Sequence, residues 1–526
     1  MPALLASGGL RLSNQGGFTH GVASGDPDQG SVTLWTRYLA SGGEASWLEV
    51  EVARDEGFRN IVAAGAGIAG PTSDFCTSIR IENLRPGEWY YYRFKAPNAA
   101  RSPVGRTRTL PDGEIDAFKI GVFSCANATS GWFNAYAHAA ERDDLDLLVH
   151  LGDYIYETDL ERSDALEGLA DARGIAPPHE LVSLADYRLR YASYRADPAL
   201  QELHRRYPMI SLWDDHETVN NSWRAGAKNH NPSTEGPWHK RMAAGVRAYH
   251  EWMPMRTRPY TSYKIGNLAS LFRLETRLIA RSAQLDADEW IAAHGGGLEN
   301  AARAFRDGPL ADPSRTMMGE TQERWLSDGL SRSVASGRRW QILAQPVIMA
   351  RTRFPTDPMP LFAADRQPPE FVLDSLRRRA RLGELGVPAT LDKWDGYPAA
   401  RKRLFDASLA ADANLVVLSG DSHNAWAFDL RNDETPVGVE FSVQGVSSLG
   451  IDKRLSGDPA EIAKSLMEAN PDLYWCDTSQ RGYMVIDVTQ DTVTSEWLFI
   501  AAREMKSTAV QATHRVACAH GSRKLT

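Results

Sequence analysis

The chain has 526 residues, of which 43% are hydrophobic and 24% charged, and its 59 basic and 67 acidic side chains give a formal net charge of −8. These fractions are typical of a folded globular protein and exclude a mainly disordered, collagen-like or disulfide-scaffold chain. The mild negative charge argues against a general nucleic-acid-binding protein, so we expect no nucleic-acid partner, although a local basic site for an anionic substrate stays open.

No apolar run reaches the roughly 18 residues that a membrane-spanning helix needs. The best run, residues 340–350, is short and interrupted by Gln and Pro. Residues 1–17 lack the charged and the fully apolar regions of a complete signal peptide, and we expect a signal-peptide remnant or an N-terminal arm there. The four cysteines have no close CxxC or CxxH spacing, so the sequence predicts neither a zinc finger nor a dithiol redox motif.

The first part of the chain has the pattern of short strands. In residues 47–52 and 78–82, apolar residues alternate with polar ones, as in a strand with one buried face. Residues 84–92 place a run of aromatic residues after a Pro-Gly turn, which resembles the corner of fibronectin type III domains, where a tyrosine hydroxyl caps nearby backbone. We take Tyr90 as this corner tyrosine and predict a small fibronectin- or immunoglobulin-like β-sandwich over residues 18–112.

After a boundary rich in proline and turn residues, short apolar runs alternate with longer helical stretches. The runs are continuously apolar, as in strands buried on both faces, and cover residues 120–123, 145–149, 209–213 and 415–418. Helices are expected at residues 135–142, 321–336 and 400–410. This alternation predicts an α/β fold, a layered sandwich flanked by helices at 113–503, followed by a C-terminal tail at 504–526.

Each of these four strands is followed immediately by residues of types that bind metals. The segments are residues 124–127 (SCAN), 152–157 (GDYIYE), 214–217 (DDHE) and 420–424 (GDSHN). In an open α/β sheet, ligands bind beyond the carboxyl ends of the strands, so distant segments can converge on one site. One such turn carries little weight, because a strand-end Asp often caps a turn. Four in one chain indicate a metal centre.

The donor atoms differ in kind between the segments. Asp153 precedes Tyr156 by three residues, which puts a carboxylate and a phenolate within reach of one cation, and a phenolate suits a hard trivalent metal such as Fe(III). Asp421 and His423 flank one residue after a glycine, so both side chains can point the same way. Cys125 is the weakest candidate alone, because a lone Cys after an apolar strand is usually a small buried hydrophobic residue.

The order of the motifs in these segments resembles that of calcineurin-like metallophosphoesterases: Gly-Asp-x-x-Tyr, then Asp-His-Glu, then Gly-Asp-x-His. Purple acid phosphatases share the Asp-x-x-Tyr pairing. Beyond these motifs, much of the chain between residues 18 and 500 is similar to the alkaline phosphatase D family. The matching segments are residues 20–27, 123–125, 152–157, 213–217, 394–398 and 420–423. The resemblance implies a layered metallophosphoesterase-type sandwich as the catalytic domain, preceded by the small β-sandwich.

The resemblance also implies a ferric ion, Fe(3+), beside Ca(2+). Carried over by motif, the iron ligands are Cys125, Asp153, Tyr156 and His423. Asp153 then also bridges to calcium, whose other ligands are Asp421 and one or more of Asp215, Asn220 and Asn221. Carboxylate and amide oxygens suit calcium, whereas phenolate, thiolate and imidazole suit iron. Spacing does not choose between the two asparagines.

Two residues are the candidates for catalysis, Asp153 as the bridging acid and His216. His216 either protonates the leaving group or positions the substrate, as in related Asn-His-Glu turns, or it is a structural histidine behind the ligands. The candidates for contact with the substrate phosphate are Arg277, Arg224 and Lys228.

Two positions depart from the families that the chain resembles. Where the alkaline phosphatase D family has Leu-Asp-Thr-Arg, this chain has Glu275 as the acid, which leaves a metal or a structural role for it open. Where purple acid phosphatases supply a further histidine, this chain offers only Gln345. We expect Gln345 to be a buried glutamine satisfied by backbone groups.

The resemblance implies metal-dependent hydrolysis of phosphate esters by a metal-activated hydroxide, without a covalent intermediate. We expect an alkaline phosphatase, a phosphomonoesterase with phosphodiesterase capability, that acts on small-molecule phosphate esters for phosphate scavenging. The alternatives are a phospholipase D-type phosphodiesterase and a catalytically silent phosphate- or glycan-binding protein, and the intact motifs argue against the silent protein. Periplasmic or secreted localisation follows from the resemblance alone, and the oligomeric state is left open.

Overall fold

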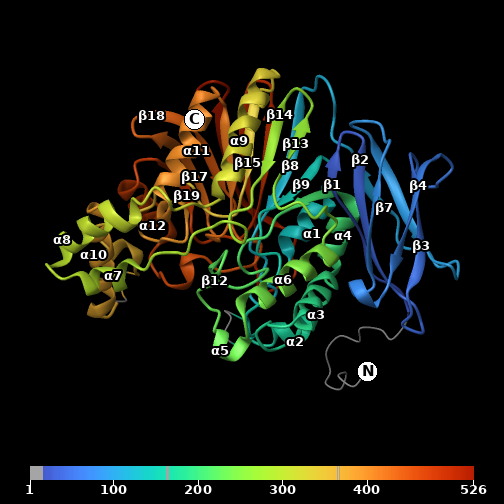
Figure 1. Cartoon of the computed structure of the whole chain (residues 1–526), viewed down its shortest axis with the longest axis horizontal. Helices are drawn as coiled ribbons and strands as arrows, with labels where there is room; N and C mark the ends of the chain where they lie inside the picture. The colour runs from blue at the N-terminus through green and yellow to red at the C-terminus, as the bar shows by residue number, and fades with distance from the viewer. Residues whose placement is uncertain (1–15, 162–164, 364, 366–367) are drawn as a thin grey trace.

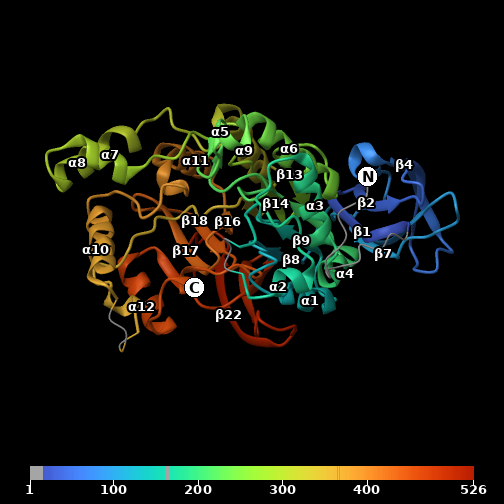
Figure 2. The same ribbon diagram turned by 90° about the horizontal axis from the view of Figure 1, so that it is seen from below.

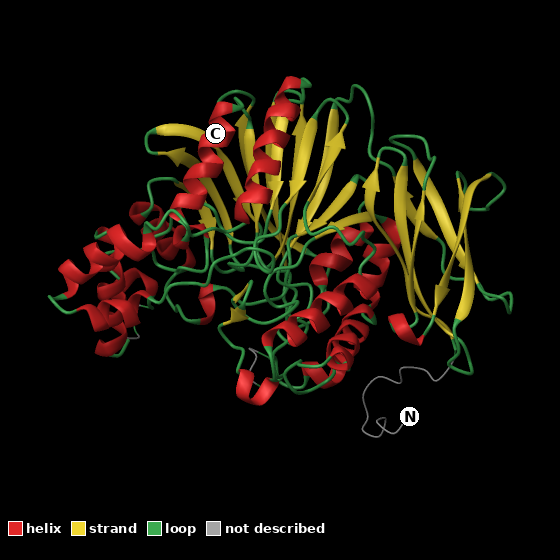
Figure 3. Cartoon of the chain, viewed as in Figure 1, coloured by secondary structure: helices red, strands yellow, loops and turns green. Residues whose placement is uncertain are grey.

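The structure, a computed structural model, describes residues 16–161, 165–363, 365 and 368–526. Most of the arm predicted at residues 1–17 lies outside the described residues. The described part of the chain is mixed α/β, with two large sheets, two small ones and helices α1 to α12 (Figures 1 and 3). The predicted α/β class is confirmed.

The larger sheet has nine strands in the order β22-β21-β20-β8-β9-β10-β1-β2-β5. In that order they are Val510–Ala519, Thr492–Ile500, Gly482–Thr489, Ala117–Phe123, Leu147–His150, Pro208–Ser211, Gly17–Asp28, Ser31–Leu39 and Cys76–Ile81. Four neighbours, β8, β9, β10 and β1, are parallel. The carboxyl ends of these four strands therefore meet at one edge of the sheet.

The second large sheet has seven strands in the order β13-β14-β15-β16-β18-β17-β19. They are Thr261–Ile265, Ala269–Arg273, Trp340–Ala344, Leu415–Ser419, Thr435–Ser442, Ala425–Asn432 and Leu473–Asp477. Here β14, β15, β16 and β18 are parallel. The small sheets consist of β4 (Ile61–Ala69), β3 (Ser46–Ala53), β6 (Trp89–Lys95) and β7 (Gly105–Arg108), and of β11 (Ser222–Trp223) and β12 (Gly226–Ala227).

One apolar core joins the two large sheets. Ile120 and Val149 of the nine-stranded sheet lie in the same buried cluster as Ile342 and Val416 of the seven-stranded sheet. Strands covered on both faces need apolar residues at every position, which is why these runs do not alternate. The four strands predicted from such runs are confirmed as β8, β9, β10 and β16.

Several of the helices cover the outer faces of this sandwich. The helices are α1 (Asn134–Glu141), α2 (Leu169–Arg173), α3 (Leu184–Arg195), α4 (Pro198–Arg206), α5 (Pro232–Glu235), α6 (Trp238–Trp252), α7 (Ala287–His294), α8 (Leu298–Phe305), α9 (Gly319–Ala335), α10 (Glu370–Glu384), α11 (Pro398–Ala410) and α12 (Pro459–Ala469). The three predicted helices are confirmed as α1, α9 and α11. In the part of the chain that the structure describes, no helix is long and apolar enough to cross a membrane.

Three helices, α7, α8 and α10, form a helical lobe at one end of the molecule, opposite the N-terminal strands (Figure 2). The lobe has a small core of its own, which includes Ile291, Phe305 and Leu382. The lobe is built from two separate segments of the chain, one that follows β14 and one that follows β15. No pattern singled out in the sequence predicted this lobe.

The N-terminal strands pack as two layers around a separate apolar cluster that includes Val50, Tyr90 and Phe94. The predicted strands at 47–52 and 78–82 are confirmed as β3 and β5. The Tyr90 hydroxyl accepts a hydrogen bond from the backbone N–H of Arg85 at 2.8 Å, as expected of a corner tyrosine.

The nine-stranded sheet runs across both predicted domain boundaries. Strand β1 pairs in parallel with β10 through Ser24 and Gly25. A Cβ on Gly25 would lie 2.5 Å from the carbonyl oxygen of Met209, so only glycine allows this approach. At the other end, residues 504–526 were expected as a tail but contain β22, which extends the sheet beyond β21 because its residues pair with that strand.

Candidate functional site

The turns after the parallel strands bring the predicted polar residues together in left-handed backbone conformations. The φ angles are 58° at Cys125, 55° at Asp153, 52° at Asn221, 57° at Asp421 and 61° at His423. Residues other than glycine adopt such angles rarely, and they persist only where the surrounding structure enforces them. Residues from distant parts of the chain thus share the same unusual backbone at one place.

One side of the site combines a thiol, a phenol, an imidazole and a carboxylate. Oδ2 of Asp153 lies 3.5 Å from Sγ of Cys125, 3.0 Å from the hydroxyl of Tyr156 and 4.0 Å from Nε2 of His423. Donor atoms of Cys125, Asp153 and His423 all lie within 4.8 Å of one another. Nδ1 of His423 lies 2.6 Å from the carbonyl oxygen of Leu449, so it carries the proton and leaves Nε2 bare toward the site.

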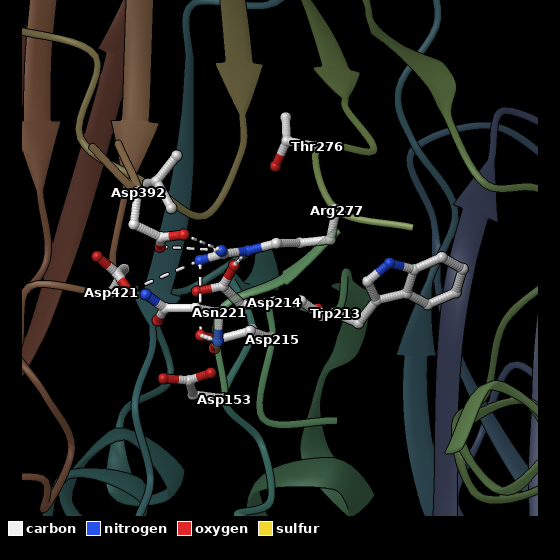
Figure 4. Close-up of polar contacts among 12 residues, drawn as sticks. Asp153, Trp213, Asp214, Asp215, Asn221, Thr276, Arg277, Asp392 and Asp421 are labelled. Atoms are coloured by element: carbon white, nitrogen blue, oxygen red, sulfur yellow. Dashed lines mark hydrogen bonds and ion pairs between the residues drawn. The ribbon is translucent and has the colours of Figure 1, made fainter. Parts of the chain in front are cut away.

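The other side of the site is rich in carboxylate oxygens. Donor atoms of Asp214, Asp215 and Asp421 lie within 4.8 Å of one another, and Asp153 forms a further such group with Asp215 and His216. Asp153 therefore belongs to a group on each side. The Asn221 side chain lies beside Asp215 and Asp421 in Figure 4, and its backbone N–H donates to Oδ2 of Asp215 at 2.7 Å.

The two asparagines that spacing could not separate differ in their surroundings. The side-chain amide of Asn220 donates to Oδ1 of Asn229 at 3.1 Å in an exposed position, away from the acid cluster. Its backbone N–H donates to Glu157. Only the Asn221 side chain thus lies beside the acids.

At the site, three buried carboxylate oxygens have no hydrogen-bond partner among the described residues: Oδ1 of Asp153, Oδ2 of Asp214 and Oδ1 of Asp215. A buried carboxylate oxygen without a partner costs free energy, and native proteins rarely leave one unsatisfied. Bound cations would satisfy these atoms. The donor set, with oxygen on one side and sulfur, nitrogen and phenol oxygen on the other, fits two different metal ions.

Burial is the largest single influence on the pKa values of these four acids. It raises the pKa of Asp153 and of Asp214 well above the usual aspartate range. It also raises the pKa of Asp421 to about 6. At Asp215 burial acts in the same direction, but the charges of Arg277 and His216 outweigh it and lower the pKa. A cation at the site would favour the charged form of all four groups.

Arg277 is the fixed positive charge of the site (Figure 4). Its guanidinium is fully buried and pairs with Asp214, and also with Asp392 at 2.9 Å. Nη2 lies 3.8 Å from carboxylate oxygens of both Asp215 and Asp421, and it has no hydrogen-bond partner within the described residues. Arg277 therefore balances the acids and keeps one donor directed toward the space between them.

The other two predicted phosphate contacts lie on the segment that follows Asn221. Arg224 and Lys228 are exposed, on the segment that contains β11 and β12. The backbone N–H of Lys228 donates to the carbonyl oxygen of Asn221 at 3.4 Å, which ties this segment to the site.

His216 and Glu157 form a pair next to Tyr156. Nδ1 of His216 lies 2.6 Å from Oε2 of Glu157, and the His216 and Tyr156 ring centroids are 4.2 Å apart. Burial alone would lower the pKa of His216, but the charges of Glu157, Asp215 and Asp153 raise it well above the usual range. Since Glu157 accepts the hydrogen bond from Nδ1–H, Nε2 is the nitrogen available to the site.

Glu217 connects the two loops that carry the acids. Its buried carboxylate accepts hydrogen bonds from the backbone N–H groups of Asp153 at 3.2 Å, Tyr154 at 2.6 Å and Asp214 at 2.8 Å. A charged acceptor that takes three backbone donors fixes both turns in one geometry.

The two departures from the resembled families have structural roles. The Glu275 carboxylate accepts from the backbone N–H groups of Arg277, Leu278 and Ile279 and from the Trp213 indole, so its oxygens are already occupied. Gln345 is buried and bonded to the backbone of Val347 as expected, and also to the Trp394 indole at 3.0 Å. Neither side chain points to a metal role.

Comparisons with known proteins agree with this geometry. A family model described as "PhoD-like phosphatase" matches residues 120–497, and one for the N-terminal domain of PhoD-like phosphatases matches residues 6–111. The chain belongs to the PhoD-like phosphatase family. It is 34% identical to alkaline phosphatase D of Bacillus subtilis over 498 residues, which cover 90% of this chain and 76% of that protein. A solved structure described as "Structure of PhoD" matches with a TM-score of 0.77 and 28% identity, over 100% of this chain and 93% of the other.

Membership of this family confirms the predicted resemblance and identifies the chain as a hydrolase of phosphoric ester bonds. Metal-dependent hydrolysis of phosphate esters is the activity that the family supports. The matches do not favour the phospholipase D-type diesterase or the silent binding protein.

Several residues of the site were not assigned a role from the sequence. Asp214, Glu157 and Glu217 stand inside the predicted strand-end segments, so the signal was present. Asp392 and Ser448 carry no such local signal. Ser448 donates from Oγ to the Tyr156 hydroxyl at 2.8 Å, from a segment 292 residues away in the chain.

Replacing Glu217 with glutamine should loosen both loops. The substitution keeps the shape but removes the charge and puts an amide N–H₂ against backbone donors, so we expect the free energy of unfolding to fall by about 2 kcal/mol, with a lower metal content. Urea denaturation and elemental analysis measure both. The matched control is Glu202→Gln, which removes an exposed partner of Arg205 and should change stability by less than about 0.5 kcal/mol. Equal losses in the two variants would contradict the role of Glu217.

Proposed function

We propose that the chain is an alkaline phosphatase, a phosphomonoesterase with phosphodiesterase capability, whose site residues would hold Fe(3+) and Ca(2+), with Asp153 among the ligands of both. The observation that carries this proposal is the position of Asp153, which has one oxygen among Cys125, Tyr156 and His423 and the other buried without a partner beside the acids. A carboxylate placed in this way can bridge two cations.

For iron we propose the ligands Cys125, Asp153, Tyr156 and His423. Thiolate, phenolate and imidazole are the donors that iron accepts and calcium does not. The bare Nε2 of His423 and the short contacts around Oδ2 of Asp153 support this set.

For calcium we propose Asp153, Asp215, Asn221 and Asp421. These side chains offer oxygen donors, as calcium requires. We favour Asn221 over Asn220 because the Asn220 amide is directed to Asn229. Asp214 pairs with Arg277 and serves as a second layer behind these ligands.

When bound, the two ions supply the Lewis acidity that activates water and stabilises negative charge on the phosphoryl group. The protein's own side chains donate the proton and bind the substrate. His216, held through Nδ1 by Glu157, gives the proton on Nε2 to the departing oxygen of the ester. The free Nη2 donor of Arg277, which lies close to Asp215 and Asp421, would donate to a phosphoryl oxygen of the substrate. Arg224 and Lys228, exposed on the segment after Asn221, would attract the anionic substrate.

We also propose that the substrates are small-molecule phosphate esters used for phosphate scavenging by a periplasmic or secreted enzyme. Residues 18–112 then form a fibronectin- or immunoglobulin-like domain without catalytic residues, and residues 113–503 form the catalytic domain. The Tyr90 corner supports the first assignment. For the second, the support is that all groups of candidate metal ligands in the described residues come from residues 125–423.

Asp153→Asn should be the most damaging single substitution at the site. It keeps the size of the side chain but removes the charge that offsets repulsion between two cations, so we expect activity to fall by at least about a hundredfold and both metals to be depleted. Activity on an aryl phosphate and elemental analysis for iron and calcium measure this. A variant that keeps its full metal complement and its rate would overturn the bridging role.

The iron assignment predicts a coloured protein, because phenolate-to-Fe(III) charge transfer absorbs visible light. Tyr156→Phe should bleach this band, and Ser448→Ala, which removes the hydrogen bond to the phenol oxygen, should shift it to longer wavelength. Tyr154→Phe is the control, because its hydroxyl contacts His204 instead of the site. A colourless, iron-free but active wild-type protein would contradict the assignment.

His216→Asn should spare the metal content and slow turnover, more for poor leaving groups than for activated aryl phosphates, because an acid matters most when the departing oxygen is basic. We expect a loss of about a hundredfold on the poorest leaving group. Glu157→Gln should show the same trend more weakly. His230→Asn, which removes a histidine bonded to Glu235, should have no such trend. A flat response for His216→Asn would make this histidine structural.

A further inference from the structure

A second cleft lies away from the metal site, where the helical lobe meets the seven-stranded sheet. Its volume is about 310 Å³, and its walls are the loop after β15, the C-terminal end of α10 and the start of α11. Four arginines line it, Arg306, Arg351, Arg353 and Arg401, against two aspartates, Asp307 and Asp395. The cleft therefore carries an excess of positive charge.

Two of the four arginines are held by partners. Arg306 pairs with Asp307 at 2.6 Å and donates to the carbonyl oxygen of Leu385. Arg401 pairs with Asp395 at 2.7 Å and donates to the carbonyl oxygen of Met349. These contacts use both aspartates of the cleft.

The other two arginines have no carboxylate of their own. Within the described residues, the side chains of Arg351 and Arg353 make no ion pair or hydrogen bond, although both line the cleft. Partial burial and the neighbouring charge of Arg401 lower the pKa of the Arg351 guanidinium, against the opposite effect of Asp395, Asp433 and Asp472. The main chain of Arg353 is fixed, because its N–H and C=O both bond to the Asn470 side chain. Both side chains are exposed and have no paired carboxylate among the described residues, although Asp395, Asp433 and Asp472 lie close enough to act on the charge of Arg351.

The end of α10 leaves room for these side chains. Gly386 has a φ of +87°, and a Cβ there would lie 2.7 Å from Cδ of Arg306. A Cβ on Gly383 would make only an ordinary van der Waals contact, at 3.7 Å, with the Cβ of Arg353, so glycine is not required there. Glycine at 386 thus lets the Arg306 side chain cross the helix end and form one wall of the cleft.

We propose that this cleft binds a phosphate-type oxyanion, through the guanidinium groups of Arg351 and Arg353. Arginine forks match the geometry of phosphate oxygens, and two guanidinium groups without a paired carboxylate beside a third arginine favour an anion. The volume is near the lower limit of roughly 300 Å³ for small-molecule sites, so the cleft accepts free phosphate or a phosphate group on a small organic body. This site goes beyond the proposed function and shares no residue with the metal centre.

A short chain segment connects the cleft with the metal centre. Asp395, which pairs with Arg401 and accepts from the backbone N–H of Thr352, lies three residues after Asp392, the partner of Arg277. An anion in the cleft therefore sits at the other end of the short loop that holds the fixed charge of the active site.

Equilibrium dialysis with radioactive inorganic phosphate tests the proposal on the metal-loaded enzyme. We expect two phosphates per chain, one at the metal centre and one in the cleft. The double substitution Arg351→Gln with Arg353→Gln should raise the dissociation constant of one of them at least about tenfold. Arg324→Gln with Arg332→Gln removes the same charge from the exposed face of α9 and should leave both phosphates bound.

Two further measurements separate the alternatives. In the Asp153→Asn variant the cleft phosphate should remain and should still depend on Arg351 and Arg353, whether or not the metal-site assignment holds. Displacement of the cleft phosphate by phenylphosphonate identifies an organic phosphate as the ligand, and no displacement identifies free phosphate. Binding of a single phosphate that the double substitution leaves unchanged, or an equal loss in the α9 control, would overturn the proposal.

Discussion

Negative charge buried where the parallel strands of two sheets end is the constraint on which the rest of the site depends. Asp153, Asp214, Asp215 and Asp421 lie together in a cluster that is unstable unless opposite charge is close. Arg277 supplies the fixed part of that charge. Some buried carboxylate oxygens remain unsatisfied, so the fold holds these acids in place without balancing all of their negative charge. This agrees with the metal dependence of the family to which the chain belongs.

Backbone geometry and hydrogen bonding act together to hold this arrangement. Left-handed turns after β8, β9 and β16 direct side chains toward the site. A regular strand end would not direct them there. Glu217 clamps two of the loops through backbone donors, and Glu275 caps the turn that carries Arg277. Acids thus serve two purposes here. Some face the site with free oxygens, and others are saturated by backbone N–H groups and shape the loops.

Local patterns in the sequence predicted the strands and helices that bury continuous or alternating apolar residues, such as β3, β8 and α9. The rule that ligands gather at strand ends was enough to place residues of four segments at one site from the sequence alone. The same rule does not reach Ser448 or Asp392, because their contacts depend on long-range packing. Strand β22 was missed although its sequence alternates, and the helical lobe has no motif of its own.

The order of strands in the nine-stranded sheet has a consequence for how the enzyme matures. Strand β8, whose end carries Cys125, is flanked by β9 on one side and by β20, near the C-terminal end of the chain, on the other. A nearby hydrogen bond from Asn134 to Ala502 spans 368 residues. Pairings this remote form late and slowly, because a large loop must close first. The sheet on both sides of the strand that leads to Cys125 therefore cannot close before residues 482–489 have been synthesised.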